Sequence, residues 1–231
     1  MKTFSSIVAV VGLVLAGPAL HAQVVWDLAG PQPYTGTDAD INTQGTFVAA
    51  VTENYSNESV TVGDTVFDAV SDSHITNIGN GGSDGSNFFG PYSPTNPAPT
   101  DYQEAVNGCS YTYTGNPAVT FNLTGLQEGQ LYQVEIWNVA NDSTRDTELS
   151  STGPAGTTTV DFNKEFEIGT FTVGASGTQS ISFEGVEAGG VGEVNAIALR
   201  DLGAIPEPST YAMFFAGVGA LVLISRLRRA V

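Results

Sequence analysis

The strongest constraint on the fold is a set of short segments in which apolar and polar residues alternate. In Ala118–Leu126, "AVTFNLTGL", every second residue is apolar, and the same holds for one face of Leu131–Val139, "LYQVEIWNV". A two-residue period places alternate side chains on opposite faces of a β-strand. The side chains expected inside are Val119, Phe121, Tyr132, Val134 and Ile136.

Further strands are expected in Ser59–Phe67, Phe166–Val173, Gln179–Gly185 and Val194–Leu202, separated by Gly, Asn and Asp turns. The alternation in "FEIGTFTV" changes phase at Gly169, which predicts a bulge or bend there. No amphipathic helix pattern occurs between residues 23 and 205. Residues 23–203 are therefore expected to form one all-β domain, a β-sandwich or jelly roll.

The first 22 residues have the pattern of a secretory signal peptide. Lys2 precedes an apolar stretch, Ile7–Gly17, and "PALHA" ends with the small residue Ala22 at the expected cleavage edge. The alternative is an uncleaved N-terminal anchor. Both interpretations place the middle of the chain outside the cytoplasm, after passage through the Sec export machinery.

Charge and cysteine content exclude some functions. All 24 acidic residues but only three of the seven basic ones lie between residues 23 and 210. A domain this acidic repels phosphate backbones. Nucleic acid is therefore not an expected partner. Cys109 is the only cysteine, which leaves no internal disulfide, and its place in the alternating "CSYTYT" predicts a buried apolar side chain.

The C-terminal segment 204–231 is expected to contain a transmembrane helix. Tyr211–Leu227 has 17 residues and as a helix would extend about 25 Å, the lower limit for a bilayer. Arginines after the span keep its C-terminal end on the cytoplasmic side. The expected membrane anchor residues are Tyr211, Phe214, Phe215, Leu221, Leu223 and Ile224, and the cytoplasmic stop is Arg226, Arg228 and Arg229.

Two prolines, Pro206 and Pro208, flank Glu207 just before this helix. A residue that precedes proline is driven into extended geometry, so "IPEP" should be extended at the outer membrane surface. An extended segment with one fixed carboxylate suits the cleft of a protease-like enzyme. A stiff spacer next to the membrane is the alternative that physics alone leaves open.

The order of Pro206, Glu207, Pro208, an apolar helix and terminal arginines resembles the PEP-CTERM sorting signal of bacterial exported proteins. The resemblance covers about the last 27 residues. It implies processing by an exosortase, a membrane-embedded cysteine transpeptidase, with transient anchoring in the inner membrane. It also implies a place at the cell surface or in a matrix of biofilm or exopolysaccharide.

The middle of the chain resembles a recurring domain of PEP-CTERM proteins. The segments that carry this resemblance are "LTGLQEGQLYQVEIW", "FEIGTFTV" and "VNAIALRDL", with "NDSTRD" (Asn141–Asp146) at the place of a short Asp/Arg segment. The resemblance implies a jelly roll of the galactose-binding or malectin-like kind. A shared fold does not by itself assign a function.

Two kinds of binding site are considered. A sugar ring stacks on aromatic faces. The candidates are Trp137, on the polar face of its strand, and a long loop that contains Phe88, Phe89 and Tyr92. The alternative is that Trp137 packs in the core and that the loop aromatics hold the loop against the domain. Calcium prefers oxygen ligands, which "GTDADIN" and "NDSTRD" supply in clusters. The calcium candidates are Asp38, Asp40, Asp142 and Asp146, and the alternative is solvated surface.

Three functional classes follow from the sequence. The leading class is a non-enzymatic surface or matrix protein without a required cofactor, and the second is a carbohydrate-binding module on the same delivery system. The third is an exported hydrolase, for which "GGSDG" around Ser83 is a formal nucleophile-elbow match. That match has neither the flanking strand–helix pattern nor a histidine later in the chain, so no catalytic residue is assigned.

Overall fold

The computed structural model of the chain describes residues 23–52, 58–69, 72–78, 83–84, 100–139, 144–153, 156–186 and 190–204. The expected signal peptide, and the expected transmembrane helix with its arginines, lie outside these residues. Within the described ranges, no helix has the length and apolar character needed to cross a membrane.

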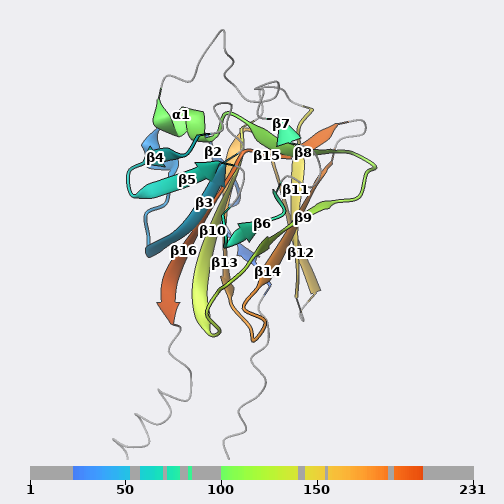
Figure 1. Ribbon diagram of the computed structural model, residues 1–231. Coiled ribbons are helices and arrows are strands. Elements are labelled where there is room, and N and C mark those ends of the chain that lie inside the picture. The colour runs from blue at the N-terminus through green and yellow to red at the C-terminus, as the bar shows by residue number, and fades with distance from the viewer. Residues whose placement is uncertain are drawn as a thin grey trace, which may run out of the picture.

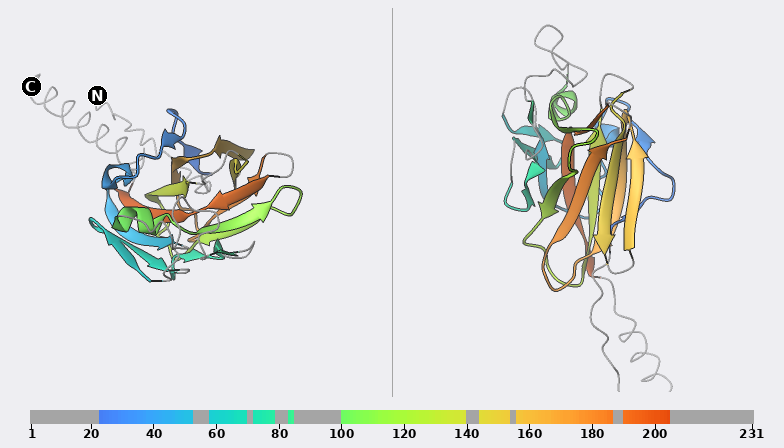
Figure 2. Two further views of the ribbon diagram at one scale, coloured as in Figure 1. Left: turned by 90° about the horizontal axis from the view of Figure 1, so that it is seen from above. Right: turned by 90° about the vertical axis from the view of Figure 1, so that its right-hand side faces the viewer.

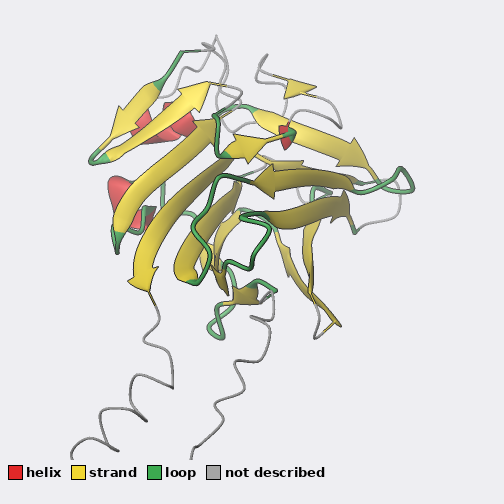
Figure 3. Ribbon diagram, turned by 60° about the horizontal axis from the view of Figure 1, so that its bottom comes forward, coloured by secondary structure: helices red, strands yellow, loops and turns green. Residues whose placement is uncertain are grey.

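Most of the described chain is β-strand, which confirms the all-β prediction (Figures 1 and 3). The largest sheet in the described part has eight strands, in the order β1-β13-β10-β16-β3-β5-β4, with β2 also paired to β13. Its strands are β1 (Val25–Trp26), β2 (Gln32–Pro33), β3 (Thr46–Thr52), β4 (Val60–Val62), β5 (Thr65–Ala69), β10 (Gln130–Asn138), β13 (Glu165–Thr172) and β16 (Ala196–Ala204).

A second sheet, with five described strands in the order β12-β11-β14-β9-β6, faces the first in a sandwich (Figure 2, right). Its strands are β6 (Ile75–Thr76), β9 (Val119–Leu123), β11 (Thr147–Gly153), β12 (Gly156–Phe162) and β14 (Gln179–Gly185). A small third sheet joins β7 (Ser83–Asp84), β8 (Cys109–Tyr113) and β15 (Val191–Val194), and two short helices, η1 (Asp38–Asp40) and α1 (Asp101–Ala105), complete the described elements.

The main hydrophobic core lies between the two large sheets. Tyr132, Val134 and Ile136 of β10 face Val119 and Phe121 of β9 across it, and all five are at most 7% exposed. The core assignment of the alternating segments is therefore confirmed. Burying side chains of this size contributes about 1.5–3 kcal/mol each, which makes this interface the main source of stability.

A second core covers the opposite face of the eight-stranded sheet. Trp137 of β10 and Phe166 of β13 lie there, in one cluster with residues of α1 and of the β4–β5 hairpin at the edge of the same sheet. Phe67 of β5 meets Trp137 edge-on, with ring centroids 5.8 Å apart. The central strands are thus buried on both faces, although their sequences alternate as if one face met water.

The bulge predicted at Gly169 is wrong. β13 pairs with β10 in continuous register through Val134↔Gly169. Phe166 and Ile168 pack in the second core, whereas Phe171 packs in the main core. The change of phase at Gly169 therefore marks the point where the large apolar side chains of β13 switch from one face of the sheet to the other. A Cβ at Gly169 would collide with the side chains of Val24 and of Trp26 in β1, so the close approach of this segment requires glycine.

Two other segments divide differently from the sequence prediction. Ser59–Phe67, expected as one strand, is the β4–β5 hairpin with its turn at Gly63 and Asp64. Val194–Leu202 is interrupted at Asn195, where the chain passes from the third sheet into the eight-stranded one. Cys109 is fully buried in β8, as predicted.

Candidate functional site

Trp137 is 0% exposed and is the largest fully buried side chain among the described residues. Its Nε1 donates a hydrogen bond to the Tyr102 hydroxyl of α1 at 2.9 Å. A ring enclosed on all sides has no face on which a sugar can stack, so the hypothesis of Trp137 as a sugar platform is wrong and the core alternative is correct. The other sugar candidates, Phe88, Phe89 and Tyr92, lie outside the described residues.

Asp40 is a structural acceptor within this second core. Its carboxylate accepts hydrogen bonds from the Thr35 and Gly36 amides, at 2.8 and 3.1 Å, and from the Tyr102 hydroxyl at 3.0 Å. Burial and the neighbouring Asp40 charge raise the pKa of Tyr102 far above its usual range. The chain Trp137–Tyr102–Asp40 thereby fastens α1 and the segment before η1 to the central sheet.

The structure gathers no calcium site from the candidate aspartates that it describes. Asp38 and Asp40 share the short helix η1, Asp146 accepts a hydrogen bond from Asn163 Nδ2 at 2.7 Å, and Asp142 lies outside the described residues. In the part of the chain that is described, no three His, Cys, Asp or Glu side chains are placed to hold a metal ion together. Asp40 is also buried, which corrects the alternative of a solvated surface residue.

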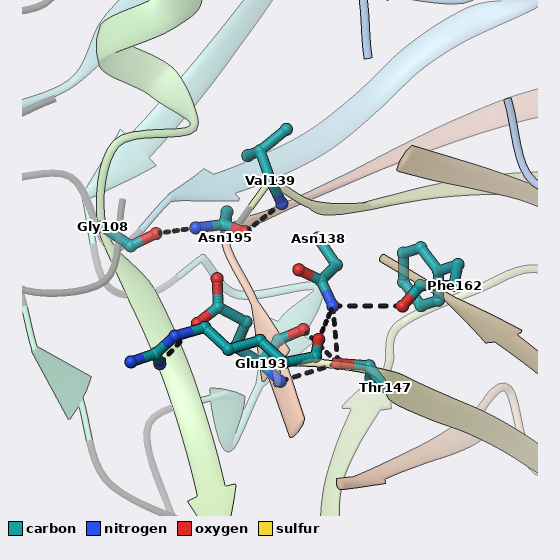
Figure 4. A network of polar contacts seen from close by, with 8 residues as sticks. Gly108, Asn138, Val139, Thr147, Phe162, Glu193 and Asn195 are labelled. Carbon is teal, nitrogen blue, oxygen red and sulfur yellow. Dashed lines mark hydrogen bonds and ion pairs between the residues drawn. The ribbon is translucent and has the colours of Figure 1, made fainter. Parts of the chain in front are cut away.

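A buried polar network joins the ends of β10, β11 and β15 (Figure 4). Asn138 Nδ2 donates to the Thr147 hydroxyl at 2.8 Å and to the Phe162 carbonyl at 3.2 Å. The Thr147 hydroxyl donates to the Glu193 carbonyl at 3.0 Å and accepts from the Glu193 amide at 2.8 Å. One hydroxyl therefore holds the second and third sheets together.

Arg145 and Glu193 form an ion pair inside the same region, with Nη1 3.0 Å from Oε2 and side chains 9% and 0% exposed. Arg145 belongs to the "NDSTRD" segment. Its ion pair with Glu193 therefore places the C-terminal end of that segment beside β15. Asn195 completes the network: its side chain accepts from the Val139 amide and donates to the Gly108 carbonyl, both at 2.7 Å. The arrangement cross-links three sheets and leaves these groups shielded from a ligand.

Two glutamates of the eight-stranded sheet are buried, and no cationic side chain of the described residues is bonded to them. Glu135 Oε2 accepts from the Asn42 amide at 3.0 Å, and burial raises the pKa of Glu135 to about 8. Glu167 Oε1 accepts from the Asp27 amide at 3.1 Å, and burial raises the pKa of Glu167 to about 7. Glu135 is opposite Ile168 and Glu167 is opposite Ile136, so the two carboxyl groups face opposite sides of the sheet and do not form the facing pair of a glycosidase.

We expect the free energy of unfolding to fall as the pH rises from about 5 to 8. Glu135 binds a proton in the folded state up to a pKa of about 8, whereas the unfolded group releases it near 4.5. The folded state therefore holds the extra proton across this interval, and one such group lowers stability by at most about 1.4 kcal/mol per pH unit. Urea unfolding at several pH values measures this slope.

The matched variants are Glu135→Gln and Glu167→Gln, each of which removes one titrating proton and keeps the side-chain shape. Each should flatten the slope, with Glu167→Gln acting mainly below pH 7. An unchanged slope in Glu135→Gln contradicts the assignment. Asp64, whose pKa is lowered by its hydrogen bond with Arg200, affects stability only at lower pH.

A surface pocket of about 400 Å³ lies beside β4 and the start of α1. It is lined by Glu58, Ser59, Val60, Thr61, Asp101 and Glu104. None of these residues is aromatic, so the pocket offers no stacking platform for a sugar, and its three carboxylic acids repel acidic polysaccharides.

The remaining candidate site adjoins the end of β16. This strand lies between β10 and β3 and runs to Ala204 at the lower end of the domain in Figure 1. Pro206, Glu207 and Pro208 follow within four residues of that end, outside the described residues. A family model described as the PEP-CTERM protein-sorting motif matches residues 204–229.

The chain carries a PEP-CTERM sorting motif. The motif indicates an exosortase-targeted protein that is exported to the cell surface or the extracellular space. The match begins at the last residue of β16, so the folded domain and the sorting motif adjoin directly. No curated protein and no solved structure matches the chain significantly.

Proposed function

We propose that the chain is a non-enzymatic protein of the cell surface or of an extracellular matrix of biofilm or exopolysaccharide. Residues 1–22 act as a signal peptide for Sec export, residues 23–203 are the delivered domain, with the jelly-roll type implied by resemblance, and residues 204–231 are the sorting signal. The observation that carries the proposal is the sorting motif at residues 204–229.

The proposed order of events follows from the chemistry of the motif. Tyr211–Leu227 halts export in the inner membrane, and Arg226, Arg228 and Arg229 remain on the cytoplasmic side because arginine is expensive to move through lipid. Pro206 and Pro208 keep Glu207 in an extended segment that an exosortase cleft can bind. Cleavage near this segment then releases or transfers the acidic domain.

The arrangement of the domain supports this topology. The described chain begins and ends at the same end of the sandwich, the lower end in Figures 1 and 3. Both membrane-directed segments can therefore emerge toward one membrane surface without crossing the domain. The acidic body can then lie in the aqueous phase on the outer side.

The mature C-terminus tests the proposal. We expect mass spectrometry of surface or matrix material from the native host to find the domain without the Arg226–Val231 segment. Recovery of the protein there with this segment intact would refute processing and leave a single-span anchor. Exopolysaccharide association is tested separately by co-purification with the matrix polymer.

The structure removes one observation that supported the carbohydrate-binding alternative, the availability of Trp137. Trp137 is buried, and none of the described residues that line the pocket beside α1 is aromatic. The sugar-stacking candidates that remain from the sequence are Phe88, Phe89 and Tyr92. Retention of the purified domain in polysaccharide affinity gels distinguishes this alternative from a structural role.

A further inference from the structure

The last three residues of β16, Leu202, Gly203 and Ala204, are attached to the sheet differently from the rest of the strand. A register shift separates them from it: Tyr132 is opposite Asp201, but Leu131 is opposite Gly203, so Leu202 is an extra residue. Gly203 has φ +92, a conformation that side-chain-bearing residues rarely adopt. This is a β-bulge, which bends a strand and interrupts its ladder.

The pairing of β16 with β3 also ends here. On the β3 side, pairing stops at Thr46↔Asp201, after a second register shift that leaves Val48 unmatched. Beyond Asp201, the only strand of the described chain that pairs with β16 is β10, through Leu131↔Gly203 and Gln130↔Ala204. Asp201 Oδ1 accepts a hydrogen bond from the Gly203 amide at 2.7 Å, which closes the regular part of the strand at Asp201.

Burial changes at the same point. Ala196 to Arg200 are at most 2% exposed, whereas Leu202 and Gly203 are half-buried and Ala204 is exposed. Apart from Gly203 and its two chain neighbours, no described residue has a heavy atom within 4 Å of the place where a Cβ on Gly203 would stand. Detaching these three residues therefore breaks a one-sided ladder and the close approach of Leu202 to Gly45, but removes no member of either hydrophobic core.

The sorting motif needs additional length at this point. Only Ile205 lies between Ala204 and Pro206, so with Ala204 paired the Cα of Pro206 is at most about 7 Å from the sheet. A cleft that binds more extended peptide than the motif itself contacts Ile205 and then residues of β16. Releasing Leu202–Ala204 lengthens the unpaired chain before Pro206 from about 7 Å to about 17 Å, measured in each case from the last residue that stays in the sheet.

We propose that Leu202–Ala204 is a detachable arm that leaves the sheet when exosortase binds the Pro206–Pro208 motif, and that it supplies the extended residues before the motif. This inference rests on the proposed sorting function. The bulge at Leu202 and the end of β3 pairing at Asp201 define where detachment stops.

A reversible cross-link tests the arm in the full-length protein. Gln130→Cys with Ala204→Cys places two cysteines opposite each other on β10 and β16. Opposed residues of an antiparallel pair have Cα atoms about 4.5–5.5 Å apart, within the range of a disulfide. In cells that carry the exosortase, the oxidised variant should accumulate as full-length precursor, with its processed fraction reduced several-fold and restored by dithiothreitol.

The matched control is Thr152→Cys with Thr157→Cys, which joins an exposed pair in the β11–β12 hairpin and leaves β16 untouched. This control should be processed as the wild type is. Inserting Gly-Ser-Gly-Ser between Ala204 and Ile205 of the cross-linked variant should restore processing, because it returns the lost reach without releasing the strand.

The outcomes separate the two proposals. Normal processing of the oxidised Gln130–Ala204 cross-link overturns the arm, and so does failure of the insertion to rescue it. If the wild-type chain itself remains unprocessed in these cells, the sorting function fails instead.

Discussion

Arg145→Met is expected to lower the free energy of unfolding by about 3–5 kcal/mol, among the largest effects of any single substitution in the domain. The Arg145 side chain is 9% exposed and its Nη1 lies 3.0 Å from Glu193 Oε2, while Glu193 is 0% exposed. Methionine fills similar space but leaves the carboxylate of Glu193 buried without this cation. Urea unfolding followed by far-UV circular dichroism measures the loss.

A double-mutant cycle separates the charge from the packing. Arg145→Met with Glu193→Gln removes both charges and keeps the Glu193 backbone bonds to Thr147, so it should be more stable than Arg145→Met alone. Arg145→Lys is the matched single control, since it keeps the charge but not the planar guanidinium. An Arg145→Met variant within about 0.5 kcal/mol of the wild type would contradict a structural role for the pair.

The main core is predictable from the sequence because the alternation of apolar and polar residues is visible within each short segment. Val119, Phe121, Tyr132, Val134 and Ile136 alternate with polar neighbours, and a strand converts that pattern directly into one buried face. The second core is harder to predict, because whether the opposite face is covered depends on chain segments far away. Trp137 was placed on a polar face beside Gln133 and Glu135, and all three are buried.

Two strand boundaries differ from the sequence prediction, one because of a turn and one because of long-range contacts. Gly63, with φ +61, forms the turn that divides Ser59–Phe67, and a Gly-Asp pair inside an alternating run is a recognised hairpin signal. Asn195 divides Val194–Leu202, and its amide bonds to Val139 and Gly108 are long-range contacts that no local pattern reveals. Gly169 was assigned to a bulge, whereas its lack of a side chain makes room for Val24 and Trp26.

The buried polar residues gave only a faint sequence signal. Glu193 and Asn195 occur in "VGEVNAIAL", where a charge and an amide interrupt an otherwise small and apolar strand. Burial of such groups requires partners, but their identity depends on the fold. The sorting motif was predictable because its function resides in a contiguous segment, Pro206 to Pro208 followed by the apolar stretch and the arginines.

Glu207→Gln is expected to slow exosortase processing by about one to two orders of magnitude. Glu207 has the only charge in the Pro206–Pro208 segment, and glutamine keeps its size and leaves both prolines in place. Losing a hydrogen bond to a charged group costs about 1.5–3 kcal/mol, which at the transition state corresponds to that change in rate. The ratio of full-length to mature protein in membranes of the native host, resolved by mass, measures the effect.

Glu128→Gln is the matched control, because Glu128 is an exposed residue of the turn before β10 and the substitution removes the same charge from the domain. It should be processed as the wild type is, which separates recognition of Glu207 from the effect of net charge. Replacing Pro206 and Pro208 with alanine while keeping Glu207 tests the second requirement, because it removes the restriction to extended geometry and keeps the carboxylate. Processing of Glu207→Gln at the wild-type rate would show that the cleft reads the backbone shape imposed by the prolines rather than the charge between them.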